Sequence, residues 1–479
     1  MPVGPPGWCS VAPSWFKVSY SVRHPHATYP YVGRSQAYAS TAFPLTFGVF
    51  QDYFGRHQNL ANSTESIWIG VLSTGVPFMG APFMTILCDT YPRIKPRYYV
   101  LFGWLLCASA LIGAAFSRSL VALAWTQGVL YGGGLLILDV PVLLILNTWF
   151  IKRRGTAYGL LFGAADAIGF GATILAEWLL RNHTLQGALL TFACGITIIS
   201  GPAIYLLKSR PADATTSIVV SESKEAAPTP SDHSTSPPPP LPITSRYYTR
   251  PIFYIFTLAN TFHSTAWYLP FMYLPSYATS LGYSPTRGAY LLAAANFAQI
   301  FGELSFGHLS DRVNVHCLIL ASTLASSIAV FTLLGMAHSL VMLSFFALIF
   351  GTFGSGLISL WARMGTFFGQ NDAQMIYSVM SFGRGLGSIV SGPISSALLR
   401  AAEGRRSYTH DNQSGDRAAN YGNGKYIYIV LFVGTSMGVS ALMGIVGLVV
   451  GWRQKELGAV DRKRSVDRER EKASQDEEI

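Results

Sequence analysis

Five ionisable side chains stand inside long apolar segments of the sequence, where a charge is costly to bury. They are Asp139, Asp166, His263, Glu303 and Arg384. A charge near the centre of a bilayer costs roughly 2.5 kcal/mol or more, so it persists only with a partner or beside a water-filled cavity. Counted from the segment ends at ~1.5 Å per residue, the five groups reach similar depths, with Glu303 somewhat shallower. The pattern predicts a polar cavity between apolar helices.

Arg384, in the segment SFGRGLGSIVSGP, is the only cation at that depth. Its guanidinium group offers a planar fork of donors that matches a carboxylate. The sequence therefore predicts Arg384 as the residue that binds an anionic substrate. A structural ion pair with Glu303 or Asp166 is the alternative.

Asp166 and Glu303 are the candidates for proton coupling, because carboxyl groups buried in membrane helices can form proton relays. Structural pairing and direct contact with substrate are the alternatives for both residues. Further candidates for substrate contact come from three segments, and each has a packing role as its alternative. That alternative is an ion pair with Arg384 for the acid, hydrogen-bonded packing for the histidine, and bonds between helices for the amides. These candidates are Asp139, His263, Asn260, Asn296 and Gln299.

The elements that position these residues are apolar segments of about 20 residues, the length that crosses a bilayer. A weaker first segment covers residues 36–54. Clearer segments follow near residues 66–88, 98–116, 121–146, 156–180, 186–207, 251–278, 287–309, 315–335, 339–361, 373–399 and 425–451. The sequence predicts an all-α membrane protein with twelve transmembrane helices in two six-helix bundles.

Composition divides the chain into five parts. Residues 1–35 form an N-terminal segment, 36–207 the first bundle, 208–250 a disordered linker rich in proline and serine, 251–452 the second bundle, and 453–479 a charged tail. Half of all residues are hydrophobic and only 12% are charged. We expect a monomer in the plasma membrane.

Positive charge gathers in short loops and in the tail, which explains the net charge of +10 without a nucleic-acid partner. Cations beside apolar segments mark the cytoplasmic face. The linker and both termini are therefore expected in the cytoplasm. Trp361 and Arg363 close the tenth segment. An aromatic and cationic anchor at the membrane interface is the simplest interpretation of that pair, and a role in a gate is the second.

Two short motifs lie at the ends of apolar segments. The first comprises Trp149, Phe150, Lys152, Arg153, Arg154, Ala157, Gly159 and Gly163, and the second is Gly307-His308-Leu309-Ser310-Asp311-Arg312. The first resembles the loop between helices 4 and 5 and the start of helix 5 in the monocarboxylate-transporter-like branch of the major facilitator superfamily, in its fungal form. The second resembles the gating motif of that superfamily. In the corresponding loop of the first half, Asp89 remains while the Gly-Arg pattern is lost.

The resemblance implies gating residues at the cytoplasmic ends of the helices: Asp311, Arg312, Asp89, Lys152, Arg153 and Arg154. Asp311 can bind the positive end of a neighbouring helix or a loop cation, and Arg312 can bind an acid. The alternative is that they only cap helices and set topology. Glu303 departs from many relatives, which carry an arginine near this point of helix 8, so a monocarboxylate substrate does not follow from the family alone.

The resemblance implies a secondary transporter that moves a small, monocarboxylate-like organic anion by alternating access with protons. The alternatives are a transporter of a larger neutral or aromatic metabolite, and a nutrient sensor that does not transport. The sequence contains no HExxH motif and no paired cysteines, so we expect no enzyme activity, cofactor or metal. Asn412, in an Asn-Gln-Ser sequon, is the glycosylation candidate.

Overall fold

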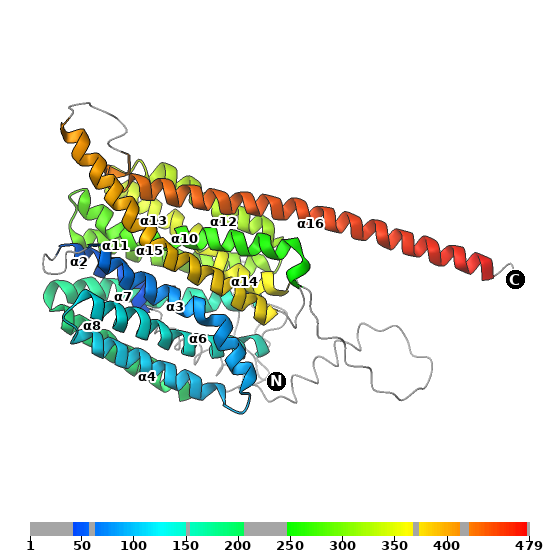
Figure 1. Ribbon diagram of the computed structural model, residues 1–479, viewed down its shortest axis with the longest axis horizontal. Coiled ribbons are helices and arrows are strands. Elements are labelled where there is room, and N and C mark those ends of the chain that lie inside the picture. Colours follow the sequence, from blue (N-terminus) through cyan, green and yellow to red (C-terminus); the bar gives the residue numbers. More distant parts are fainter. Residues whose placement is uncertain are drawn as a thin grey trace, which may run out of the picture.

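The computed structural model describes residues 42–56, 63–149, 154–205, 247–366, 373–411 and 421–476. Every regular element in these ranges is helical (Figure 1). The first half contains α2 (Ala42–Arg56), α3 (Ser63–Thr90), α4 (Pro96–Ala115), α5 (Leu120–Leu123), η5 (Ala124–Leu130), α6 (Tyr131–Trp149), α7 (Arg154–Asn182) and α8 (Leu185–Tyr205).

The second half begins at the short η6 (Tyr247–Thr249). It contains α10 (Pro251–Ser280), α11 (Pro285–Ser310), α12 (Val315–Ala329), η7 (Val330–Leu334), α13 (Leu340–Gly354), α14 (Gly356–Thr366), α15 (Ala373–Asp411), η9 (Tyr421–Asn423) and α16 (Ile427–Asp476). The predicted segments from residue 66 onward coincide with these helices, apart from the differences described below.

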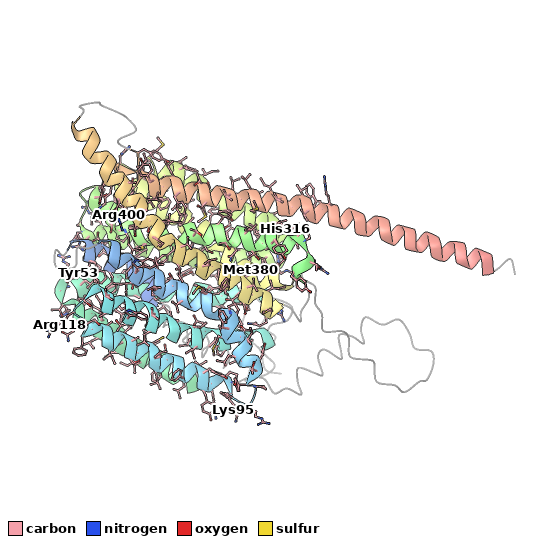
Figure 2. The ribbon with its side chains drawn as sticks, in the orientation of Figure 1. Tyr53, Lys95, Arg118, His316, Met380 and Arg400 are labelled. Carbon is pink, nitrogen blue, oxygen red and sulfur yellow. The ribbon has the colours of Figure 1, made fainter. Side chains whose placement is uncertain are left out.

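Seven helical stretches in the described residues are long and apolar enough to cross a membrane. They are Ser66–Thr90, Pro96–Ala115, Leu120–Leu146, Arg154–Asn182, Val315–Leu334, Leu340–Gly365 and Ile427–Arg453. The helices lie roughly side by side, and the exposed cations Lys95 and Arg118 mark the two ends of α4 (Figure 2). This is the architecture of an all-α membrane protein.

The two halves of the chain pack against each other. In Figure 1 the helices of residues 42–205, blue to teal, fill the lower part of the view, and those of residues 247–476, green to red, fill the upper part. The halves meet chiefly where α7 packs against α11, α3 against α15, and α2 against α10. Residues that face these seams can therefore line a space between the halves.

Glycines allow two of these helix pairs to approach closely. A Cβ atom placed on Gly307 of α11 would lie 2.7 Å from the carbonyl oxygen of Gly155 and 2.8 Å from Cα of Gly159, both on α7. A Cβ atom on Gly385 of α15 would lie 2.6 Å from Cα of Met79 on α3. Only glycine fits such backbone contacts, which are typical of tightly packed membrane helices.

Three helices differ from the predicted segments. The segment predicted at 339–361 is broken at Ser355, which lies between Gly354 and Gly356, and its hydroxyl donates to the carbonyl of Gly351 at 2.9 Å. The two glycines and a serine that bonds back to the preceding turn weaken the helix there. Helices α15 and α16 continue to Asp411 and Asp476, far past their apolar parts, because helix formation does not require a bilayer.

Candidate functional site

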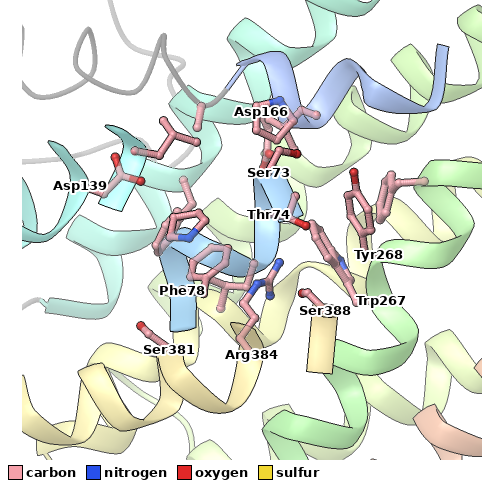
Figure 3. A pocket seen from close by; sticks show the side chains of 18 of the residues that line it. Ser73, Thr74, Phe78, Asp139, Asp166, Trp267, Tyr268, Ser381, Arg384 and Ser388 are labelled. Atoms are coloured by element: carbon pink, nitrogen blue, oxygen red, sulfur yellow. The ribbon is translucent and has the colours of Figure 1, made fainter. Parts of the chain in front are cut away.

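A cavity of about 120 Å³ lies between the two halves of the chain (Figure 3). Its lining comes from α2, α3, α6 and α7 in the first half and from α10, α11, α14 and α15 in the second. Asp139, Asp166, Glu303 and Arg384 all line it. Four ionisable groups that are far apart in the sequence therefore share one enclosed space.

Arg384 of α15 is held by aromatic rings. Its guanidinium carbon lies 4.2 Å from the ring centroid of Trp267, 4.9 Å from that of Phe78 and 5.7 Å from that of Trp361. We call these three rings the aromatic cage. The side chain is 3% exposed, and its Nη1 atom has no hydrogen-bond partner among the described residues. The cage stabilises the buried cation by cation–π contacts and leaves a donor free.

The guanidinium group forms no ion pair with the carboxylates that share its cavity, within the ranges that the structure describes. Its charge nevertheless acts on Asp166 and Glu303, which lie within electrostatic range. The structural ion pair considered as an alternative role for Arg384 is thus not formed in this conformation. The cation remains available to an anion that enters the cavity.

The two carboxyl groups nearest to that cation differ in their surroundings. Glu303 of α11 is 1% exposed and accepts a hydrogen bond from the hydroxyl of Ser359 on α14. Asp166 of α7 is 6% exposed, and its Oδ2 atom has no partner among the described residues. One carboxyl group is thus held in place by a neighbouring helix, while the other is free to change its contacts.

Asp139 of α6 lies on a different side of the cavity from Arg384 (Figure 3). Its Oδ1 atom is buried without a hydrogen-bond partner in the described part of the chain. The neighbouring lining residues on α6 are apolar, namely Leu135, Val140 and Leu143. The acid therefore presents an unsatisfied acceptor at a largely apolar wall.

Two of the four remaining candidates line the cavity. Asn296 donates to the hydroxyl of Thr173 at 3.0 Å, and Gln299 donates to Oδ1 of Asn296 at 3.0 Å. Both side chains are buried on α11 and lie among the lining residues. They form a hydrogen-bonded pair at the seam between α7 and α11.

The other two candidates are fully buried outside the cavity lining. His263 bonds through Nε2 to the carbonyl of Gly354 at 2.8 Å. Asn260 donates to the carbonyl of Met380 at 2.7 Å and accepts from Nε1 of Trp361 at 3.0 Å. These contacts hold helices together, and the bond from Asn260 fixes one ring of the aromatic cage.

The interfacial anchor predicted at Trp361 is wrong. The indole is 0% exposed and packs against Phe78 and Tyr377 inside the protein. Position in the segment suggested an interface, but the break at Ser355 and the bond to Asn260 turn this residue inward. Sequence reasoning also missed Phe78 and Trp267, because an aromatic residue in an apolar segment looks the same whether it packs in a core or faces a cation.

Asp311 joins the halves at one end of the cavity. Its carboxylate accepts hydrogen bonds from the backbone nitrogens of Gly155 and Thr156 at 3.2 and 3.0 Å, and from the Thr156 hydroxyl at 2.8 Å. These donors form the N-terminal end of α7, where the helix dipole favours an anion. We call this contact the Asp311 latch.

Three of the remaining gating candidates lie in the described part of the chain. Arg312 and Asp89 are exposed, and neither side chain forms a hydrogen bond or ion pair with residues that the structure describes. Arg154 is half-buried at the start of α7. Lys152 and Arg153 lie outside the described residues, as does the sequon residue Asn412.

Two further carboxylates join the halves at the opposite end. Glu177 of α7 accepts a hydrogen bond from the hydroxyl of Thr286 on α11 at 2.8 Å. Asp52 of α2 accepts one from Thr279 of α10 at 2.8 Å and pairs with Arg56 at 2.9 Å. We call these contacts the Glu177 and Asp52 latches. Sequence analysis did not single out Glu177 and Asp52, because an acidic residue near the end of a membrane span is common and its free-energy cost there is small.

The described residues contain no group of three histidine, cysteine or acidic side chains that could hold a metal ion. The chemistry that the cavity offers is recognition by charge, hydrogen bonds and aromatic faces.

Comparison with known proteins places these features in a family. A sequence model described as the Major Facilitator Superfamily matches residues 35–392. Monocarboxylate transporter 13 of Rattus norvegicus is 28% identical over 285 residues, which cover 58% of this chain and 60% of the relative. MFS-type transporter 1 of an Ophiocordyceps species is 27% identical over 317 residues, 64% of each chain. The matches thus span less than two thirds of these two relatives.

A third relative and a solved structure extend the likeness. MFS transporter asaE of Aspergillus flavus is 24% identical over 382 residues, covering 78% of this chain and 79% of that protein. A crystal structure of the nucleoside transporter NupG superimposes with a TM-score of 0.59 at 11% identity, covering 88% of this chain and 99% of that chain. The fold is shared across this distance.

Proposed function

The chain belongs to the Major Facilitator Superfamily, and we propose that it moves a small, monocarboxylate-like organic anion across a membrane by alternating access, coupled to protons. The family and the relatives are transporters rather than enzymes. The observation that carries the proposal is Arg384, a buried cation in a cavity between the halves, with a free donor and no carboxylate partner among the described residues.

In this proposal the helices from α2 to α8 form one six-helix bundle and those from α10 to α16 form the other. Together they give twelve spans that enclose a site at the membrane midplane. Residues 208–250 link the bundles, and both termini lie in the cytoplasm of a monomeric protein in the plasma membrane. The end of the helices that carries the Asp311 latch then faces the cytoplasm.

The anion binds through its carboxylate to the guanidinium group of Arg384. The aromatic cage orients that group and excludes water around it, which strengthens the charge pair. Asn296 and Gln299 supply further polar contacts from the wall formed by α11. An apolar or aromatic substituent of the substrate can pack against Trp267 and Phe78, which is why a larger aromatic metabolite remains the second candidate.

Protons balance the charge that the anion brings. Asp166 and Glu303 lie within electrostatic range of Arg384, so a proton on either carboxyl group changes how strongly the cation attracts an anion. We assign the proton to Asp166, because the carboxyl group of Glu303 is already bonded to Ser359. When the cavity binds the anion and a proton together, the added charges cancel, so the bundles can move without carrying an extra unpaired charge through the membrane.

The latches provide the alternation. Helices α7 and α11 are joined by Asp311 at one end and by Glu177 at the other, and the Asp52 latch reinforces the second end. Hydrogen bonds join the halves at both ends in this structure, and in our proposal each set breaks in turn. Opening toward the cytoplasm breaks the Asp311 latch, and opening outward breaks the Glu177 and Asp52 latches.

The test is uptake of labelled organic acids into vesicles that contain the purified protein, with and without an inward proton gradient. We expect the gradient to drive uptake by the wild type, Arg384→Ala to abolish it, and Arg384→Lys to retain part of it, because lysine keeps the charge without the fork. Arg400→Ala, an exposed cation on the same helix, is the control. Uptake that survives Arg384→Ala, or acid that never moves in the wild type, contradicts the proposal.

A further inference from the structure

Asp139 has no task in the mechanism described so far. It lines the cavity, its Oδ1 atom is buried without a partner among the described residues, and it is absent from the groups on which the charge of Arg384 acts. A buried acceptor without a donor is unfavourable, so a carboxyl group in this position requires something to bind. The apolar wall on α6 supplies no donor.

The charges of the cavity also do not balance for a simple anion. Three carboxyl groups, those of Asp139, Asp166 and Glu303, share the space with the single guanidinium group of Arg384. A monocarboxylate adds another negative charge to this set. A substrate that brings one positive charge together with its carboxylate leaves fewer charges uncompensated in a medium where they are costly.

The positions of the groups fit such a substrate. Arg384 and its aromatic cage form one pole of the cavity, and Asp139 lies on a different side of it (Figure 3), with no ion pair between the two in the described residues. The two poles offer opposite charges to one molecule. An amine bound at Asp139 would satisfy the free acceptor, while the carboxylate of the same molecule satisfies the free Nη1 donor of Arg384.

We propose that Asp139 binds a protonated amine of the substrate, so that the transported compound is a zwitterionic aminocarboxylate recognised at two poles. This inference rests on the proposed function, since it takes the carboxylate site at Arg384 as given. Asp139 then determines specificity, because a site built to bond a substrate group discriminates strongly against analogues that lack it.

The experiment compares compounds that differ only in the amine. Vesicle uptake is measured for phenylalanine and 3-phenylpropanoate, and for alanine and propanoate, with 2-phenylethylamine as a probe that has the amine alone. In the wild type we expect the amine to raise uptake within at least one pair by roughly tenfold or more. Asp139→Asn should reduce that ratio to about one, whereas Asp139→Glu should retain much of it, because the charge is kept.

Controls separate this inference from the proposed function. Arg400→Ala should leave the ratio within each pair unchanged, and the uptake of the carboxylates that remains in Asp139→Asn reports that the variant is folded. If carboxylates move and Arg384→Ala stops them, but the amine gives no advantage or Asp139→Asn preserves it, the role of Asp139 is refuted and the proposed function stands. If no carboxylate moves in the wild type, both are overturned.

Discussion

At the scale of single residues, the site rests on a cation held by rings rather than by an acid. The three rings of the cage surround Arg384 from α3, α10 and α14. Buried cation–π contacts of this kind contribute about 2 kcal/mol when they are shielded from water. The rings therefore influence substrate binding without touching the substrate carboxylate.

Replacing the closest ring should weaken binding. We expect Trp267→Leu to raise the KM for the transported anion about tenfold, because the guanidinium group loses its nearest cation–π contact and its fixed orientation. The measurement is the concentration dependence of vesicle uptake. Trp178→Leu is the matched control, since that indole is 53% exposed on α7. An unchanged KM in Trp267→Leu would show that the cage does not position Arg384.

The proton should travel on Asp166. In Asp166→Asn we expect an inward proton gradient to lose its stimulation of uptake, while exchange of labelled for unlabelled substrate continues, because exchange requires no net proton movement. Both rates are measured in the same vesicles. Glu303→Gln serves as the comparison, since its carboxyl group is bonded to Ser359. If the proton gradient still stimulates uptake in Asp166→Asn but no longer does so in Glu303→Gln, then Glu303 carries the proton and Asp166 does not.

Sequence alone identified the charged residues of this site but not the aromatic ones. Asp139, Asp166, Glu303 and Arg384 stood out because a charge in an apolar segment is energetically costly, and all four line the cavity. The rings carried no such signal, since their burial is favourable anywhere in a helix bundle. Whether Asn260 or His263 faced the cavity depended on the rotation of α10, which hydropathy does not determine.

At the scale of helices, the seam between α7 and α11 is the best defined contact between the halves. Glycines bring the two backbones together near the Asp311 latch, and Glu177 joins the same helices at their other end. In the alternating-access cycle that we propose, the seam loosens at one end while it holds at the other. Its glycines and its latches can be tested separately.

The close approach can be tested by adding one methyl group. We expect Gly307→Ala to destabilise the protein by about 1 to 3 kcal/mol, because its Cβ atom would overlap the backbone of Gly155 and Gly159. The measurement is the Tm of the purified protein in detergent. Gly195→Ala on α8 is the control, since a Cβ atom there meets nothing within 4 Å and alanine favours the helix. Equal Tm changes in the two variants would contradict the tight packing.

The latches should shift the conformational balance in opposite directions. Asp311→Asn weakens the end that we propose to be cytoplasmic, and Thr286→Val removes the hydroxyl that donates a hydrogen bond to Glu177. We expect a single reporter cysteine at Ser73→Cys, a lining position, to react less with an external impermeant reagent in Asp311→Asn and more in Thr286→Val. The background has its native cysteines replaced by serine. If the cysteine reactivity changed in the same direction in both variants, the two latches would not act on opposite ends of the transport cycle.

Hydropathy predicted where the helices lie better than where they end. Helix α16 was expected to stop near residue 451, yet it continues to Asp476, because charged residues of good helix propensity extend a helix beyond its apolar part. Hydropathy also missed the break at Ser355, although here the helix ends where the apolar segment continues. The segment stays apolar across it, and hydropathy does not register two glycines around a serine.

At the scale of the whole molecule, the all-α membrane architecture could be derived from composition and segment lengths, and the likeness to NupG supports the fold. The family followed from two short motifs and is shown by the match over residues 35–392. Substrate identity did not follow, because it depends on a few side chains brought together from eight helices. The architecture alone also does not distinguish the proposed transporter from a sensor that does not transport.

Removing the tail distinguishes those two functions. We expect deletion of residues 455–479 to leave substrate uptake unchanged, because the apolar part of α16 that can cross the membrane, Ile427–Arg453, stays intact. Uptake and the amount of protein in the membrane are measured together. A protein that acts only as a sensor would show no uptake in either form, and its signal would depend on the tail.

In the transport cycle that we propose, the aromatic cage also affects the rate. An arginine paired with an internal carboxylate must break that bond each time a substrate arrives and form it again each time one leaves. Because Arg384 rests on ring faces and has no such competitor among the described residues, binding begins without an exchange of partners. The empty carrier keeps a ready cation, and its return step is not slowed by an internal salt bridge.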